Sequence, residues 1–262
     1  MQDRQYNDIV NLVLSYADNA LLLGHRNSEW TGHGPILEQD IAITNISLDL
    51  IGQARNFYQY AADLINKSNP EKTAFETEDT LAYLRDAWDF KNCLLVEQDN
   101  GDWAKTMLRQ FLFSNYQYLL YKELSQSRDG TLSAIAEKAL KECKYHLRWS
   151  SEWVIRLGRG TEESFKRTEK ALAALWKFTG ELFVPTNYES AAASLGIAPD
   201  PSSLYEAWLA GTNEIFEEAS IVMPQGNTNP LTGGKTGVHT EHLGYILAEM
   251  QFLQRTYPGC EW

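Results

Sequence analysis

The feature that most constrains this fold is a helical period of apolar residues that recurs along almost the whole chain. Four long segments carry it, at about residues 6–23, 36–65, 103–127 and 132–157. A long connection, about 66–102, separates the second from the third and holds a shorter helix at about 78–89. We find no strand-like alternation of useful length. Four long helices with one long crossover predict an all-α, ferritin-like four-helix bundle in which helices two and three lie parallel.

The rest of the chain predicts additional helices. They lie at about 162–183, from Ser202 or Ser203 to about 219, and at about 239–255. A Gly/Pro-rich loop at 224–237 precedes the last of them. We therefore expect a single ferritin-like domain over 1–262, with a core bundle at about 6–157 and accessory C-terminal helices at about 162–256.

Composition limits the partners and the compartment. The chain has 262 residues, 44% of them hydrophobic, which is enough for a large core. A net charge of −12 argues against a nucleic-acid or anionic-membrane surface, and no apolar run is long enough to span a bilayer. The N-terminus has no signal-peptide pattern. Three widely spaced cysteines, Cys93, Cys143 and Cys260, form no disulfide framework, so we expect a cytoplasmic protein.

A ferritin-like outline raises the question of a di-iron site. Such sites take a Glu from one helix of each half and a Glu-x-x-His from the other. The first helix has no Glu, and the acid nearest its middle is Asp18; Asp49 in the second helix is followed three residues later by Gly52. Glu38 is followed at the same spacing by Ile41. These two helices therefore lack their share of the ligands.

The third and fourth helices also fail the pattern. Residues 109–120, "RQFLFSNYQYLL", contain no acid, and Glu123 comes late. In the fourth helix Glu142 and His146 are four residues apart rather than three. This pair is either an intrahelical contact or the relic of a metal site. We therefore expect no catalytic residue and no metal on this chain, with Glu142 and His146 as the relic candidates.

Polar residues at helical spacing in the second helix indicate a buried network. They are Asn45, Asp49, Gln53 and Asn56. Buried polar groups need hydrogen-bond partners, so such a network would hold the packing register.

Two short motifs resemble a metal site and a phosphate-binding loop, but the residues around them are not predicted to form the secondary structure that such sites need. His25, Glu29 and His33 have the spacing of metal ligands on a helix, yet four breakers surround them, at Gly24, Gly32, Gly34 and Pro35. We predict a loop there instead, with Trp30 as an anchor and Pro35 in the first turn of helix two.

The second motif is "NPLTGGKT", residues 229–236. It matches a phosphate-binding P-loop except that Asn229 replaces the first Gly and no strand precedes it. Lys235 remains a candidate ligand-binding residue for a phosphate or a carboxylate; the alternative is a flexible surface loop. For His239 and His242 we expect capping and packing roles.

Longer blocks carry a family resemblance. They are "GHRNSEWTGHGPILEQDIAITNISLDLIGQARNFYQYAA" (24–62), "FKNCLLVEQDNGDWAKTMLRQFLF" (90–113), "ALKECKYHLRWSSEWVIRLGRGT" (139–161), "LWKFTGELF" (175–183) and "GGKTGVHTEHLGYILAEMQFLQRTYPGCEW" (233–262). With these blocks the chain resembles the PaaC-type subunits of the bacterial phenylacetyl-CoA epoxidase, the ring-oxidation complex of phenylacetate degradation.

The resemblance implies a ferritin-like, non-catalytic structural subunit of a heterooligomeric monooxygenase complex. The di-iron site would lie on a related, PaaA-like catalytic subunit, which this chain would pair with and support. A reductase would supply electrons from NADPH through FAD and an iron–sulfur cluster, so no cofactor is expected on this chain. The isolated chain could form a homodimer. Candidate anchors for this pairing are the aromatics Trp30, Trp149 and Trp153; the alternative for each of them is a place in the core. The alternative from the enzyme class is a self-sufficient di-metal oxygenase or oxidase.

Overall fold

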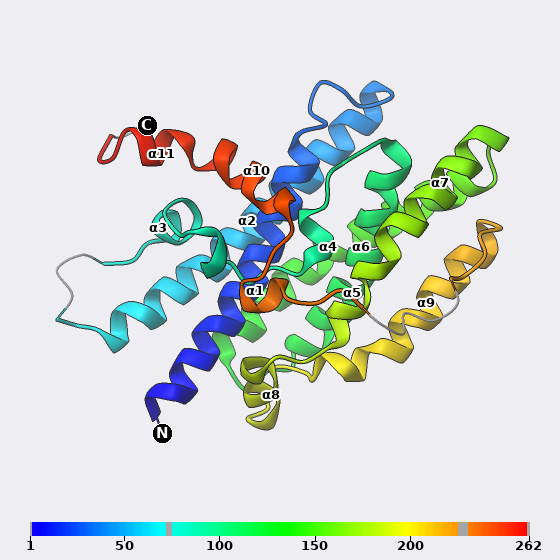
Figure 1. The fold of residues 1–262 in the computed structure, drawn as a ribbon. Helices are drawn as coiled ribbons and strands as arrows, with labels where there is room; N and C mark the ends of the chain where they lie inside the picture. Colours follow the sequence, from blue (N-terminus) through cyan, green and yellow to red (C-terminus); the bar gives the residue numbers. More distant parts are fainter. Residues whose placement is uncertain (1, 72–74, 225–229, 261–262) are drawn as a thin grey trace. The chain divides into compact units, whose positions relative to one another are not determined.

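The computed structural model describes residues 2–71, 75–224 and 230–260 (Figure 1). By its contacts the chain divides into two compact units, residues 1–99 with 233–262 and residues 100–232. The described residues are helical, with no strand among them, which confirms the predicted all-α class and is consistent with a ferritin-like bundle. That the two units form one domain, with helices two and three parallel, stays a prediction.

The first unit is built on a pair of long helices. α1 (Gln2–Ser28) and α2 (Leu37–Ser68) share the most extensive interface between elements of this unit, and the loop between them is short. The short connection makes the pair an antiparallel hairpin. The long connection follows, with α3 (Glu78–Tyr83), a 3₁₀ turn η1 (Ala87–Asp89) and α4 (Leu94–Glu97).

The C-terminal segment belongs to the same unit. It contains a 3₁₀ turn η5 (Gly234–Thr236), α10 (Glu241–Met250) and α11 (Phe252–Thr256). α10 packs on α1, α4 and η1, so the end of the chain returns to the long connection (Figure 1).

The second unit is built on the other long pair. α5 (Trp103–Leu124) packs against α6 (Gly130–Gly158). Asp102 and Asp129 accept hydrogen bonds from the first backbone N–H groups of these two helices and so fix where they begin. The unit also contains the helices α7 (Glu162–Leu175), α8 (Asn187–Ser194) and α9 (Tyr205–Glu218), and the 3₁₀ turns η2 (Trp176–Phe178), η3 (Gly180–Phe183) and η4 (Pro201–Leu204).

Several predicted boundaries are wrong. The helix predicted at 162–183 ends at Leu175 and continues as two 3₁₀ turns, and the one predicted at 239–255 is interrupted at Gln251. The short helix at 78–89 is likewise divided into α3 and η1. Pro35 does not lie in the first turn of α2, because Ile36 is the N-cap. Pro35 still disfavours helical geometry at the residue before it, Gly34.

The most informative error concerns Gly24. Its low helix propensity predicts the end of the first helix, but α1 continues through it to Ser28. A Cβ at residue 24 would lie 3.2–3.3 Å from Ile51, Leu50 and the carbonyl oxygen of Ser47. The glycine therefore allows α1 and α2 to approach closely, and this packing offsets its low propensity.

Candidate functional site

The acids and histidines of this chain do not gather into a metal site within the described residues. No group of three or more His, Cys, Asp and Glu side chains there could hold a metal ion. The ligand set of a di-iron centre therefore does not fit this part of the chain. His25 lies in α1, Glu29 pairs with Arg26 at 2.8 Å and His33 is exposed, so the spacing of these three residues does not mark a site.

The relic candidates lie on one helix. His146 is completely buried in α6 and Glu142 is half-buried, and both contact neighbouring groups. The backbone carbonyl of His146 accepts a hydrogen bond from the Ser150 hydroxyl at 2.7 Å. The relic interpretation stays a prediction.

The buried polar side chains in the middle of α5 are neutral apart from Arg109. Gln110 donates to the Ser114 hydroxyl at 2.8 Å, and Asn115 donates to the Thr212 hydroxyl at 3.0 Å. Arg109 donates to the side-chain oxygen of Asn100 at 2.6 Å. Where a di-iron helix supplies Glu or His ligands, the middle of α5 therefore presents amides, hydroxyls and a cation.

Asp18, in the middle of α1, is completely buried and fully engaged. Its carboxylate forms an ion pair with Arg85, which follows α3 in the long connection. It also accepts hydrogen bonds from the Tyr58 hydroxyl at 2.5 Å and from the backbone N–H of Lys91 at 2.7 Å. The Arg85 guanidinium lies 4.2 Å from the centre of the Phe90 ring. We call Asp18, Tyr58 and Arg85 the Asp18 cluster.

The electrostatics of the Asp18 cluster follow from burial and close charges. Burial, reinforced by the charge of Asp18, raises the pKa of the Tyr58 hydroxyl well above its ordinary value of 10.0. Burial alone would lower the pKa of Arg85, but the Asp18 carboxylate outweighs burial and the pKa is raised. An arginine thus supplies the positive charge that a metal ion would supply to a buried carboxylate.

A second buried acid, Glu97, joins the long connection to the C-terminal segment. Its carboxylate accepts hydrogen bonds from the Asn92 amide at 2.9 Å and from the backbone N–H and hydroxyl of Thr240, both at 2.7 Å. His239 lies against it, with Nδ1 2.9 Å from the carboxylate and Nε2 3.1 Å from the carbonyl oxygen of Phe90. Thr240 is the N-cap of α10, so this carboxylate lies where the helix dipole favours negative charge.

Arg26 reinforces this contact from the last turn of α1. Its guanidinium donates to the backbone carbonyl of Glu97 at 3.0 Å and to that of His242 at 3.4 Å. Three separated segments of the first unit therefore meet around Glu97, whose backbone carbonyl and carboxylate are bound by groups of the other two.

Two glycines, Gly234 in the P-loop-like motif and Gly237 directly after it, serve the same contact. A Cβ at Gly234 would lie 2.4 Å from the carbonyl oxygen of Asn92, and one at Gly237 would lie 2.3 Å from that of Trp88. Only residues without a side chain allow this approach. Lys235 is buried and makes contacts, so the flexible surface loop expected there is wrong at this end; Asn229 lies outside the described residues.

Two further expectations need correction. In α2 Gln53 is buried, but Asn45 is exposed and Asp49 and Asn56 are half-buried, so the four residues do not form one buried network. Trp149 is a core residue rather than a surface anchor, because it is buried and packs edge-on against Trp103.

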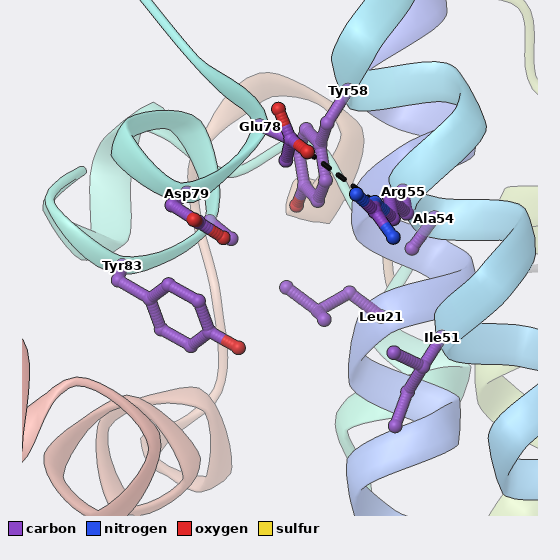
Figure 2. A pocket seen from close by; sticks show the side chains of 9 residues that line it. Leu21, Ile51, Ala54, Arg55, Tyr58, Glu78, Asp79 and Tyr83 are labelled. Carbon is purple, nitrogen blue, oxygen red and sulfur yellow. Dashed lines mark hydrogen bonds and ion pairs between the residues drawn. The ribbon is translucent and has the colours of Figure 1, made fainter. Parts of the chain in front are cut away.

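A pocket of about 280 Å³ opens between α2 and α3 (Figure 2). Arg55 and Glu78 pair across it at 3.3 Å, and the Tyr83 hydroxyl points toward it. Asp79 also lines the pocket, so its charged side chains are one base and two acids.

Sequence reasoning missed the partners of Asp18 and Glu97. The isolated acid in an apolar helix was a signal that Asp18 needs a cation, but nothing local indicated Arg85, 67 residues away.

The described helices also include none long and apolar enough to cross a membrane.

These features define a helical protein of the ferritin-like class whose two most buried acids, in the described residues, are bound by internal partners. The chain belongs to the family described as phenylacetic acid catabolic protein, whose model matches residues 1–262. It is similar to the C subunit of 1,2-phenylacetyl-CoA epoxidase from Escherichia coli strain K12. The identity is 46% over 256 residues, which cover 98% of this chain and 100% of that protein. The resemblance seen in the sequence is confirmed.

Proposed function

We propose that this chain is a structural subunit of a multicomponent 1,2-phenylacetyl-CoA epoxidase and does not itself catalyse the reaction. The similarity to an epoxidase subunit over the whole length supports its place in such a complex. The observation that carries the non-catalytic role is the Asp18 cluster. A carboxylate that already binds a guanidinium, a phenol and a backbone N–H has no lone pairs left for a metal ion.

In this proposal the chain pairs with a related, PaaA-like di-iron subunit in the cytoplasm. The iron belongs to that partner, and FAD, an iron–sulfur cluster and NADPH belong to a reductase. This chain supplies rigidity, since a helix pair with apolar contacts and neutral hydrogen bonds can brace a partner whose interior holds charged ligands.

The competing function is a self-sufficient di-metal oxygenase or oxidase. The buried His146, with Glu142 one turn before it, is the observation that favours it. A di-metal site needs further carboxylates, and no suitable group exists in the described residues.

Metal analysis of the purified chain separates the two functions. We expect far less than one iron or manganese ion per chain after growth in iron- and manganese-supplemented medium. Close to two ions per chain, lost when Glu142 and His146 are both replaced by Ala, would establish the competing function.

Reconstitution tests the structural role. Epoxidation of phenylacetyl-CoA should require both the di-iron subunit and this chain. Variants Glu142→Ala and His146→Ala should lower stability or assembly while the turnover of each intact complex stays close to wild type. A loss of several orders of magnitude in an intact complex would place this chain in the chemical step.

A further inference from the structure

One face of α2 carries large apolar side chains in solvent. Leu37 is 72% exposed, Ile41 52% and Leu48 62%. Their spacing of four and seven residues places them on one side of the helix. We call these three residues the α2 face. The opposite side of α2, with Ile43, Ile46 and Leu50, is completely buried.

Within the first unit, α3 lies beside the second half of this side of α2. Arg55 and Gln59 continue the same helical face, and both donate to the Glu78 carboxylate of α3, at 3.3 and 3.0 Å. α3 therefore contacts the C-terminal half, and both helices line the pocket in Figure 2. Across the described residues the N-terminal half keeps its apolar side chains exposed.

Exposed apolar side chains in a helical row are typical of an interface, since single exposed ones are common but aligned ones are not. A helix is the natural occupant, because residues four and seven apart match the ridges of another helix. Gly52, exposed one turn beyond Leu48, meets nothing within 4 Å of a built Cβ and leaves room for such an approach.

The charges around the α2 face select the kind of occupant. Between residues 37 and 54 the helix contains Glu38, Asp40 and Asp49 and no Lys or Arg. A second copy of this chain would place acid against acid in a symmetric contact. An occupant with Lys or Arg beside its apolar row would meet opposite charges instead.

We propose that the α2 face docks an amphipathic helix with a basic rim on the di-iron partner subunit. The proposal rests on the proposed function, because it assigns the surface through which that pairing takes place. The partner helix covers Leu37, Ile41 and Leu48, and its cations lie opposite the exposed Glu38.

The test compares the affinity of this full-length chain and its variants for the purified di-iron subunit by isothermal titration calorimetry. Ile41→Asp and Leu48→Asp place a charge in the apolar contact and should each raise Kd at least about tenfold. Val222→Asp is the matched control, since Val222 is 80% exposed and lies in the other unit; its Kd should equal wild type. Leu48→Ser adds no charge and should weaken binding by a smaller factor. Far-UV circular dichroism should show wild-type helicity for all four.

A separate set of measurements tests whether the partner helix carries basic residues beside its apolar row. Glu38→Lys should weaken binding, and the wild-type Kd should rise between 50 and 300 mM NaCl by a factor of about two or more. Loss of binding in Ile41→Asp without either effect would refute the basic rim.

Other outcomes separate this proposal from the proposed function. If wild type binds the di-iron subunit and Ile41→Asp binds equally well, the α2 face is not the docking site and the proposed function stands. If wild type does not bind that subunit at all, the proposed function fails. If Ile41→Asp dissociates a homodimer of the isolated chain and leaves the partner Kd unchanged, the occupant is a second copy and the proposal is wrong.

Discussion

Separating the charges of the Asp18 cluster should destabilise the first unit far more than removing a surface ion pair. Asp18→Asn replaces the carboxylate with an amide that can accept at only one atom. It leaves the guanidinium of Arg85, whose side chain is 11% exposed, without its counter-charge. Removing one partner of a buried pair costs about 3–5 kcal/mol. Arg85→Met should cost a similar amount, since the completely buried Asp18 would keep only neutral donors.

The structure offers a matched control variant and a double-mutant cycle for the ion pair between Asp18 and Arg85. Arg55 pairs with Glu78, and its side chain is 67% exposed. The variant Arg55→Met should therefore lower the free energy of unfolding by only about 0–1 kcal/mol. The double variant Asp18→Asn with Arg85→Met buries no net charge, so its cost should fall below the sum of the single costs by about 2–3 kcal/mol.

Urea unfolding of the purified chain, followed by far-UV circular dichroism, measures these differences. With a slope of about 2 kcal/mol per molar urea, a loss of about 4 kcal/mol lowers the midpoint by about 2 M. An Asp18→Asn midpoint equal to that of Arg55→Met would refute a buried, charge-compensated pair. Strict additivity in the double variant would refute the coupling between the two side chains.

Three further predictions concern the C-terminal segment and the end of α1. Glu97→Gln should cost about 2–4 kcal/mol, because an amide cannot accept all the hydrogen bonds that converge there; faster hydrogen exchange in α10 would report it, and unchanged exchange would contradict it. Gly234→Ala should cost about 1–3 kcal/mol in urea unfolding, because its Cβ would lie 2.4 Å from a carbonyl oxygen. Gly244→Ala, exposed in α10 with nothing within 4 Å, is its control and should stabilise by about 0.5–1 kcal/mol. Burial lowers the pKa of His25 below its ordinary value of 6.5. As the pH falls, His25 is therefore protonated in the unfolded chain before it is protonated in the folded chain. The stability due to His25 is therefore complete above pH 6.5 and falls as the pH drops toward the folded pKa. His25→Gln should lose less stability than wild type between pH 7 and about 5, and equal losses in urea midpoints would contradict this.

The helical class and the long helices could be predicted because their signal is local. An apolar period near 3.6 residues predicts a helix with one buried face wherever that face finds cover, and all four predicted long segments are helices here. The absence of acids from the middle of α5 could also be predicted, because residues 109–120 contain no Asp or Glu.

Helix ends and single glycines were less predictable. Gly24 reads locally as a breaker, but contact with Ile51 and Leu50 makes it an interior residue of α1. Gly234 lies in a motif that resembles a phosphate loop, but the close carbonyl oxygen of Asn92 explains this glycine. In both cases the deciding atom belongs to a distant segment.

The sequence by itself determined that the chain is helical, that it lacks the ligand pattern of a di-iron centre and that it resembles one family along its whole length. Only the tertiary structure decided what its buried acids do. Asp18 meets Arg85 across 67 residues, and Glu97 meets His239 across 142. Periodicity reports which face of a helix avoids water, whereas the partner of a buried charge depends on how distant segments pack, and no local pattern contains that information.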